Sequence, residues 1–443
     1  MKDFRRTPAL ALSFAGFLTQ LDVTAVVVAL PTIGDELGFG LAAYAWTMDA
    51  YSLAFTATLL AAGALADRHG RRRALLIGNV LFAAASLACG LAWDGPSLWA
   101  ARAVQGLGAA FVITGSIALT ASAYPEPAHR ARAFGLAGIV SGAAMAIGPT
   151  LGGVVAAWFG WRWIFLANLA FCLLAAWIVP RLVAEERAAD ARPLDPLGIA
   201  LLTLALGLAI ETLLAGKTLT HFTLGASAAL ACAAWFVVQQ RRRLQPLLDP
   251  ALLTQPAMIA IAVLLITVSI GYWAVLVYLP WFLASASGLS PAQAGVALLA
   301  ATLPMVVLPP VAGHLATRCG WRVLFTCGLL TIAAGDLVLA LRPSWTLLLL
   351  GMAVIGTGTA LVQSQLSGAV VTLAPPAQAG MASALTIVMR QGGFAVGIAL
   401  LGAALGQEQT AVAYTSMFAL AAGASGLGAL AALLLLPARP TRP

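Results

Sequence analysis

The sequence is poor in charged residues. They make up 9% of the 443 positions, whereas hydrophobic residues make up 61%, and soluble domains carry about 25% charged residues. A soluble chain of this length could not bury so much apolar surface. The composition therefore excludes a soluble globular protein and indicates a helical integral membrane protein.

The sequence also has no pattern of paired cysteines or clustered histidines. Its five cysteines are isolated and lack CxxC spacing, and its four histidines are not at metal-ligand spacing. The motifs HExxH, GxSxG and GxxxxGK[ST] are missing. We therefore expect no enzyme activity, no metal and no cofactor, and any pumping must be driven by an ion gradient.

Apolar runs long enough to cross a bilayer recur along the whole chain, since a span needs roughly 20 residues. The first run is too long for a cleavable signal peptide and is read as a span. Fourteen spans are predicted: 9–30, 45–66, 74–93, 98–120, 133–156, 162–179, 196–214, 221–239, 257–282, 292–315, 322–341, 345–372, 380–404 and 412–436.

The basic residues set the orientation of these spans. With both termini in the cytoplasm, 19 of the 24 Lys and Arg residues fall on the cytoplasmic side, three in outer loops and two, Arg102 and Arg390, inside spans. This bias follows the positive-inside rule. It accounts for the net charge of +8 without a nucleic-acid partner.

A short charged loop occurs twice. Gly63–Arg73 reads GALADRHGRRR, and a degraded copy, GHLATRCGWR, begins 250 residues later at Gly313. Two matched halves are common in transporters. We predict a six-helix bundle over 1–180, a linker with two inserted helices over 181–250, and a second six-helix bundle over 251–443.

Asp22 lies well inside the first predicted span. An ionised carboxylate at mid-bilayer costs about 2.5–3.5 kcal/mol on insertion scales. Such a residue must face water, be paired, or be protonated for part of the time. Proton coupling is favoured over a packing hydrogen bond to a neighbouring helix.

Three further charged residues lie inside predicted spans. Arg102 shares a helical face with Gln105 through i, i+3 spacing, so a cavity role is favoured modestly over snorkelling to the outer interface. Asp49 is equally compatible with proton relay or a cavity rim and with an interfacial helix-start acid. Arg390 lies deeper and is the stronger cavity candidate.

Glu211 and Asp336 lie toward the outer ends of their spans. We expect both to be solvated or locally paired. Polar and aromatic residues at depth give weaker candidates for a substrate cavity: Gln105, Tyr272, Trp273 and Gln363.

Span five is rich in small residues at helical spacing and contains one proline. Such residues let two helices touch backbone to backbone. The run ends as Gly148-Pro149-Thr150-Leu151-Gly152-Gly153, which is more specific than ordinary close packing.

Together these stretches resemble the major facilitator superfamily, specifically its fourteen-helix drug:proton antiporter family, which includes the methylenomycin-resistance and quaternary-ammonium exporters. Gly63–Leu75 matches the superfamily loop motif, and Leu21–Pro31 is similar to the family motif of span one. Arg102–Gly108 matches R-x-x-Q-G-x-G, and Trp161–Phe165 reads WRWIF. Gly135–Gly153 is similar to the antiporter motif, with Ala144 in place of a glycine.

The resemblance implies alternating access between two six-helix bundles, with Asp22 binding and releasing the proton and Arg102 modulating that step. Asp49 is added to the proton-coupling residues from its own position in span two. The resemblance further implies that Gly148, Pro149, Gly152 and Gly153 limit leak. It also implies that the loop motif locks the cytoplasmic side in one state through Gly63, Asp67, Arg68, Gly70 and Arg71. The short loop at Gly406–Gln409 departs from relatives that carry a long outer hairpin there.

The expected function is proton-driven export of small, mostly hydrophobic drugs or toxic compounds across a bacterial cytoplasmic membrane, by a multi-pass monomer in the lipid bilayer. Two alternatives remain open: a dedicated proton-coupled exporter of one metabolite or antibiotic class, and a non-transporting membrane scaffold. An uptake symporter is disfavoured by the glycines of span five.

Overall fold

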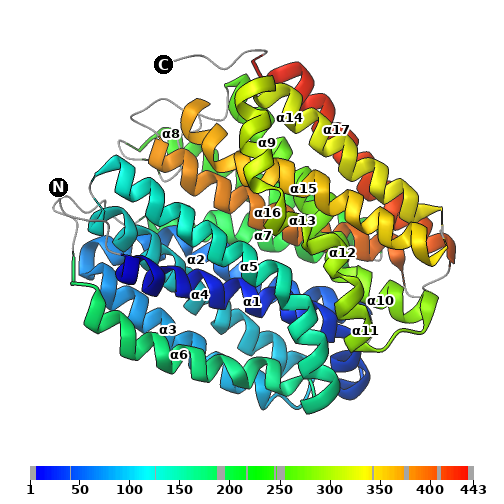
Figure 1. The fold of residues 1–443 in the computed structure, drawn as a ribbon, viewed down its shortest axis with the longest axis horizontal. Coiled ribbons are helices and arrows are strands. Elements are labelled where there is room, and N and C mark those ends of the chain that lie inside the picture. The colour runs from blue at the N-terminus through cyan, green and yellow to red at the C-terminus, as the bar shows by residue number, and fades with distance from the viewer. Residues whose placement is uncertain are drawn as a thin grey trace. The chain divides into compact units, whose positions relative to one another are not determined.

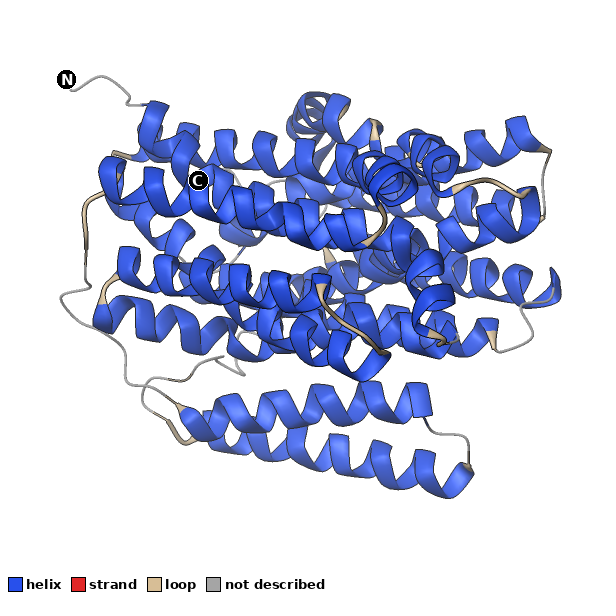
Figure 2. Cartoon of the chain, turned by 90° about the horizontal axis from the view of Figure 1, so that it is seen from below, coloured by secondary structure: helices blue, strands red, loops and turns tan. Residues whose placement is uncertain are grey.

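The computed structural model describes all residues except 1–5, 40, 125, 187–194, 216–217, 244–245, 247–254, 342–343, 374–378, 407–410 and 438–443. Every regular element in the described part is a helix (Figure 2). The predicted short loop at 406–409 falls mostly outside the described residues.

The first half contains six helices and is followed by the inserted pair. They are α1 (Arg6–Leu37), α2 (Leu41–His69), α3 (Arg71–Gly90), α4 (Gly95–Ala123), α5 (Pro127–Phe159), α6 (Arg162–Leu182), α7 (Pro196–Ala215) and α8 (Leu219–Arg241).

The second half is more broken. Its elements are α9 (Pro256–Val268), the π-helical η2 (Ser269–Ala274), α10 (Val275–Ser287), α11 (Pro291–Ala297), α12 (Leu299–Thr302), α13 (Pro304–Val307), α14 (Pro309–Ala340), α15 (Trp345–Leu373), α16 (Ala379–Leu405) and α17 (Ala411–Leu435) (Figure 1).

The 250-residue repeat is visible in these bounds. Helix α4 covers 95–123 and α15 covers 345–373, so both ends differ by 250 positions. The same offset relates α1, which starts at 6, to α9, which starts at 256. The backbone agrees as well, because Gly70 and Gly320 both have positive φ, of 118° and 78°. Glycine adopts such angles without steric cost.

The count of fourteen spans stays a prediction. Ten helices of the described part are long and apolar enough to cross a membrane, and an eleventh span results if the bent pair in α2 is counted as one. Three shorter apolar helices, Pro196–Ala209, Pro291–Val307 and Met389–Leu405, lie where further spans were predicted.

The chain divides into two compact units. Unit 1 contains Met1–Ala200 with Leu289–Gly295, and unit 2 contains Leu201–Gly288 with Val296–Pro443. The predicted boundaries at 180 and 250 stay a prediction. Within unit 1, α1 packs against α5, α4 and α6, and α3 packs against α4 and α6, so the middle of α1 is surrounded by other helices.

Candidate functional site

A fully enclosed ion pair lies in unit 1. Asp22 of α1 and Arg102 of α4 meet at 2.6 Å between Oδ2 and Nη1, and both side chains are 0% exposed. A buried charge pair is tolerated only when its geometry is good and its remaining polar atoms are hydrogen-bonded. The surroundings of Asp22 therefore decide whether the carboxylate can stay ionised here.

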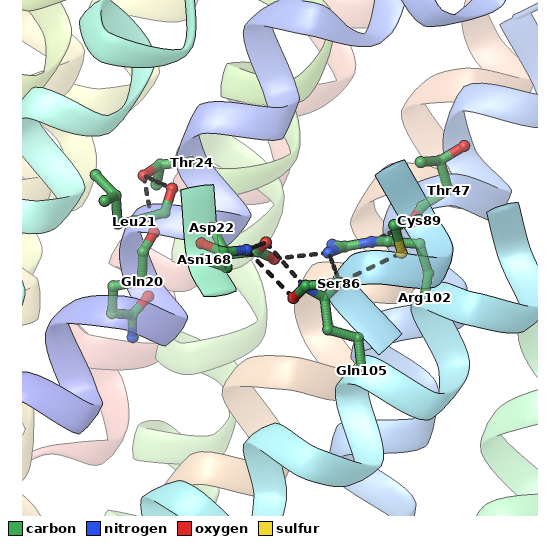
Figure 3. A network of polar contacts seen from close by, with 10 residues as sticks. All are labelled: Gln20, Leu21, Asp22, Thr24, Thr47, Ser86, Cys89, Arg102, Gln105 and Asn168. Atoms are coloured by element: carbon green, nitrogen blue, oxygen red, sulfur yellow. Dashed lines mark hydrogen bonds and ion pairs between the residues drawn. The ribbon is translucent and has the colours of Figure 1, made fainter. Parts of the chain in front are cut away.

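Side-chain amides supply those hydrogen bonds to Asp22, whereas Arg102 Nη2 has no hydrogen-bond partner in the described part of the chain. Gln105 donates from Nε2 to Asp22 Oδ1 at 2.9 Å, and Asn168 of α6 donates from Nδ2 to the same oxygen at 2.7 Å. Ser86 of α3 accepts from both amides, at 2.9 Å and 3.4 Å. Helices α1, α3, α4 and α6 thus each contribute one or two side chains to a single polar cluster (Figure 3).

The guanidinium of Arg102 is held from three more directions. Its Nε donates to the Thr47 carbonyl of α2 at 3.2 Å, and its Nη1 also donates to Gln105 Oε1 at 2.6 Å. The guanidinium carbon Cζ lies 4.5 Å from the centre of the Tyr51 ring, which is a cation–π geometry. Arg102 is therefore fixed in the bundle and does not reach the outer interface, so snorkelling does not describe it.

Sequence reasoning missed Asn168 and Ser86, because each is a single small polar residue in an apolar run. The sequence pattern nearest to Asn168 is the WRWIF segment, which begins seven residues earlier at Trp161. Trp161 Nε1 donates to Glu36 Oε2 at 2.6 Å, and Arg162 pairs with the same carboxylate. The start of α6 is thereby fixed to the end of α1, so that α6 runs beside α1, and Asn168 lies two turns into α6.

Asp49 is enclosed but stands apart from this cluster. It is 0% exposed, and in the described part of the chain neither of its carboxyl oxygens has a hydrogen-bond partner. An interfacial acid at a helix start would be solvated, so that alternative does not fit its position within α2. Its role in proton transfer stays a prediction.

Glu211 and Asp336 were both expected to be solvated or locally paired, and the structure bears this out only for Glu211. Glu211 is paired, with Oε1 3.2 Å from His221 Nε2 of α8. For Asp336 the expectation is wrong, because the residue is 0% exposed and both oxygens lack a hydrogen-bond partner among the described residues. Its place near the end of α14 suggested access to water, but α15 and α17 pack over that helix.

The charged loop is ordered by two carboxylates. Asp67 accepts from Arg71 Nε at 2.9 Å and pairs with Arg71 Nη2 at 2.8 Å, whereas Arg68 is exposed. Glu185, which follows α6, accepts from the backbone N–H groups of Arg72 and Arg73 at 2.9 Å and 3.0 Å. A carboxylate at this place satisfies free donors of the first turn of α3. Gly70 joins α2 to α3, while a Cβ added to Gly63 would lie 3.9 Å from the Thr114 side chain, an ordinary van der Waals contact.

Glu185→Gln should lower the midpoint of thermal unfolding, because the amide loses the negative charge at the N-terminus of α3. The expected loss is about 0.3–1 kcal/mol at low ionic strength and should shrink in high salt. Glu186→Gln is the matched control, because in the described part of the chain Glu186 contacts α3 through its backbone carbonyl alone, which accepts from Arg71 N. Equal effects of both variants at low salt would contradict the capping role.

The glycines of α5 fall into two groups. A Cβ on Gly148 would collide with Thr24, and one on Gly152 would lie 2.7 Å from Ala25 Cα, so α5 and α1 touch close to Asp22. Gly153 lies against Pro291 of α11 in the same unit, where Gly295 approaches the Pro149 carbonyl. By contrast, Gly135, Gly138 and Gly142 have nothing within 4 Å of an added Cβ, so close contact at the glycines of α5 is limited to its second half.

The candidates for a substrate cavity lie in different environments. Gln105 is fully buried as a donor to Asp22. Tyr272 and Trp273 of η2 are 1% and 8% exposed, and Tyr272 donates its hydroxyl to the Ala301 carbonyl at 3.3 Å. Gln363 and Arg390 are half-buried, and the Arg390 carbonyl accepts from Ser269 Oγ at 3.0 Å. Their contact with substrate stays a prediction.

Bundles of apolar helices, an internal repeat and a buried acid on the first helix are features of membrane transporters. The chain matches the sequence profile of the Major Facilitator Superfamily over residues 12–273 and 261–443, and it belongs to that family. It is accordingly a multi-pass membrane protein.

Its relatives carry names of resistance and efflux proteins. The multidrug resistance protein Stp of Mycobacterium tuberculosis (strain CDC 1551 / Oshkosh) is 33% identical over 410 residues, covering 90% of this chain and 76% of that protein. The methylenomycin A resistance protein of Streptomyces coelicolor is 32% identical over 414 residues, covering 90% and 84%. These likenesses confirm the family resemblance inferred from the motifs.

Solved structures support the fold. A peptide transporter POT in complex with sulfate matches with a TM-score of 0.71 at 18% identity, covering 96% of this chain and 94% of that one. At that identity the likeness concerns the fold alone. The predicted major facilitator fold is thereby confirmed, apart from the number of spans.

Proposed function

We propose that this protein is a secondary active transporter that exports small, mostly hydrophobic compounds across the bacterial cytoplasmic membrane in exchange for protons. The names of its relatives support export of drugs, and the enclosed Asp22 cluster supports the proton coupling. Alternating access between the two halves of the repeat moves the compound. A proton crossing a potential of 100 mV releases about 2.3 kcal/mol.

The single observation that carries the proposal is the Asp22–Arg102 pair with its amide donors. An ionised Asp22 is compensated by the guanidinium and by two N–H groups on one oxygen. Protonation removes the carboxylate charge and leaves Arg102 without its counter-ion, which is costly in an enclosed site. The protonated and deprotonated forms therefore favour different packings of α1 against α4, and this difference couples the proton to a conformational change.

The other predicted residues take roles around this centre. The glycines at the end of α5 hold it against α1 next to Asp22 and restrict leak of protons. The Asp67–Arg71 pair and the Glu185 contact with α3 stabilise one state of the cytoplasmic loop. Asp49 serves as a relay for protons on α2.

The test uses everted membrane vesicles from cells that express the full chain. Ethidium, tetraphenylphosphonium, puromycin and methylenomycin A are each added, and uptake and proton release are recorded together. Proton release with several of these compounds supports multidrug export. The absence of proton release with all four, when the vesicles hold a verified proton gradient, would overturn the proposal.

A dedicated exporter of one antibiotic class is the second candidate. It is favoured by relatives named after single antibiotics, the methylenomycin A resistance protein and the puromycin resistance protein of Streptomyces alboniger, which is 32% identical over 399 residues. Proton release with one compound of the panel alone would select this candidate.

Asn168→Ala should reduce substrate-dependent proton release by roughly 10- to 100-fold, because Asp22 Oδ1 loses a donor to a charged acceptor, worth about 1.5–3 kcal/mol. Asn79→Ala is the matched control. Asn79 is also a buried amide between α3 and α6, but it donates to the Cys172 carbonyl at 2.8 Å and does not contact Asp22. Both variants should lose stability, whereas only Asn168→Ala should lose coupling, and an equal loss of coupling in both would remove Asn168 from the site.

A further inference from the structure

Asp336 is a buried acid that the Asp22 mechanism does not use. It lies on α14 in unit 2, is 0% exposed, and has no hydrogen-bond partner for either oxygen among the described residues. An ionised carboxylate without water, counter-ion or donor is among the costliest groups to bury. The neutral, protonated carboxyl is the form that fits this site.

The repeat relates Asp336 to the Asp22 cluster. With the 250-residue offset, Asp336 occupies the position of Ser86, which accepts hydrogen bonds from Gln105 and Asn168 in unit 1. An acid therefore stands in unit 2 at a position that belongs to the polar cluster in unit 1.

The partners of that cluster have no polar counterparts in unit 2. The positions that match Arg102, Gln105 and Asn168 are apolar and at most 2% exposed: Met352, Ile355 and Phe418. The position that matches Asp22 is Tyr272. Unit 2 thus has a carboxyl at the position of Ser86, not at that of Asp22, and the matching positions lack the cation and amides that would hold it ionised.

Among the described residues, no charged side chain faces Asp336 from the helices that pack on α14. Helices α13, α15 and α17 and segment η2 contain no Asp, Glu, Lys, Arg or His. Their titratable residues are tyrosines with other partners, since Tyr272 donates to the Ala301 carbonyl and Tyr414 pairs with Ser285 at 3.0 Å. Within α14 the nearest charged residue is Arg322, fourteen residues and about 21 Å away along the helix. Arg342, six residues after Asp336, lies beyond the end of α14 and outside the described residues.

The face of α14 that carries Asp336 packs on the π-helical segment. Ile332, one turn before Asp336, lies 3.1 Å from where a Cβ on Gly271 of η2 would be. The same glycine adjoins Ser425 of α17, whose hydroxyl is also buried and has no hydrogen-bond partner in the described part. Single π-turns inside helices are frequent at functional sites, and their backbone can rearrange without breaking the whole helix.

We infer that Asp336 is a second proton-binding carboxyl of the transport cycle, located in unit 2. The role of Asp336 in exchange rests on the proposed function, whereas proton binding by Asp336 does not. In the state described here, Asp336 holds its proton on a carboxyl oxygen. When the helices around η2 separate and admit water, the O–H bond breaks, the proton passes to water and the carboxylate is solvated. Each cycle then moves one proton more than Asp22 carries.

Infrared difference spectroscopy on the full chain in lipid nanodiscs tests proton binding directly, with the proton as the ligand. Spectra are compared between about pH 5.5 and about pH 8.5, a range that lies above the ordinary titration of a solvated Asp. A carbonyl band of a protonated carboxyl should be present in the wild type at about pH 5.5, where a solvated Asp is already ionised. That band should be absent from Asp336→Asn and shifted in Asp336→Glu. A wild-type spectrum that Asp336→Asn leaves unchanged would overturn the inference.

Proteoliposomes with the panel compound of largest flux test its role in exchange. Asp336→Asn should lower the number of protons released per compound by about one, and Asp336→Glu should restore it. The matched control is Glu211→Gln. Glu211 is an acid of the inserted helices that pairs with His221, and its substitution should leave the number of protons released per compound unchanged.

The two proposals fail in different ways. If the wild type couples protons to export and Asp336→Asn keeps the wild-type proton number, the second site is wrong and the transporter stands. If the wild type releases no protons with any compound, the proposed function is lost. In that case the infrared titration still decides whether Asp336 binds a proton.

Discussion

Asp22→Asn should abolish substrate-dependent proton release in everted vesicles, with a fall of about 100-fold or more. The amide cannot bind and release a proton, yet it keeps nearly the shape of the carboxyl and can still contact Gln105 and Asn168. The substitution also leaves the Arg102 guanidinium buried without its counter-ion. Breaking one side of a buried pair costs about 3–5 kcal/mol, so the variant should also unfold at a lower temperature.

A double variant separates lost coupling from lost stability. In Asp22→Asn with Arg102→Gln, the uncompensated charge is gone, so most of the stability should return. Proton release should not return, because no titratable group remains at the centre. Measuring the wild type, both single variants and the double variant gives the coupling energy of the pair. Substrate-dependent proton release that survives in a folded Asp22→Asn protein would remove Asp22 from the mechanism.

Gly152→Ala should destabilise the protein by about 1–3 kcal/mol, the usual effect of an added methyl group in a site without room. The new Cβ would lie 2.7 Å from Cα and 2.8 Å from the carbonyl carbon of Ala25. Backbone atoms cannot rotate away as a side chain can, so α5 must move off α1. Because Ala25 lies one turn after Asp22, proton-coupled export should fall as well.

The matched control lies on the same helix. Gly138→Ala adds the same methyl group where nothing lies within 4 Å. It should be neutral or stabilising by up to about 1 kcal/mol, since alanine favours a helix more than glycine does. Thermal unfolding in detergent measures both variants, and export assays follow in vesicles. Equal stability of the two would show that the α1–α5 contact does not depend on the absence of a side chain at Gly152.

Much of the fold could be predicted because it depends on properties of single segments. Hydropathy and run length indicated the helices, and the two copies of the charged loop gave the 250-residue repeat that the bounds of α4 and α15 reproduce. The i, i+3 spacing of Arg102 and Gln105 placed both on one face, and both contact the same carboxylate. Two of the five side chains in the cluster, Asn168 and Ser86, carried no such pattern.

By itself, the sequence determined that this is a membrane protein of repeated helical halves, with an acid and an arginine in its first bundle. These features follow from composition, periodicity and spacing along one helix. Only the tertiary structure decided that Asn168 and Ser86 complete the Asp22 site, that Glu185 caps α3, and that Asp336 is enclosed. The reason is physical: which face of one helix meets another depends on its rotation and on the packing of its neighbours, so a lone polar residue acquires its partners, or loses its water, only when the bundle assembles.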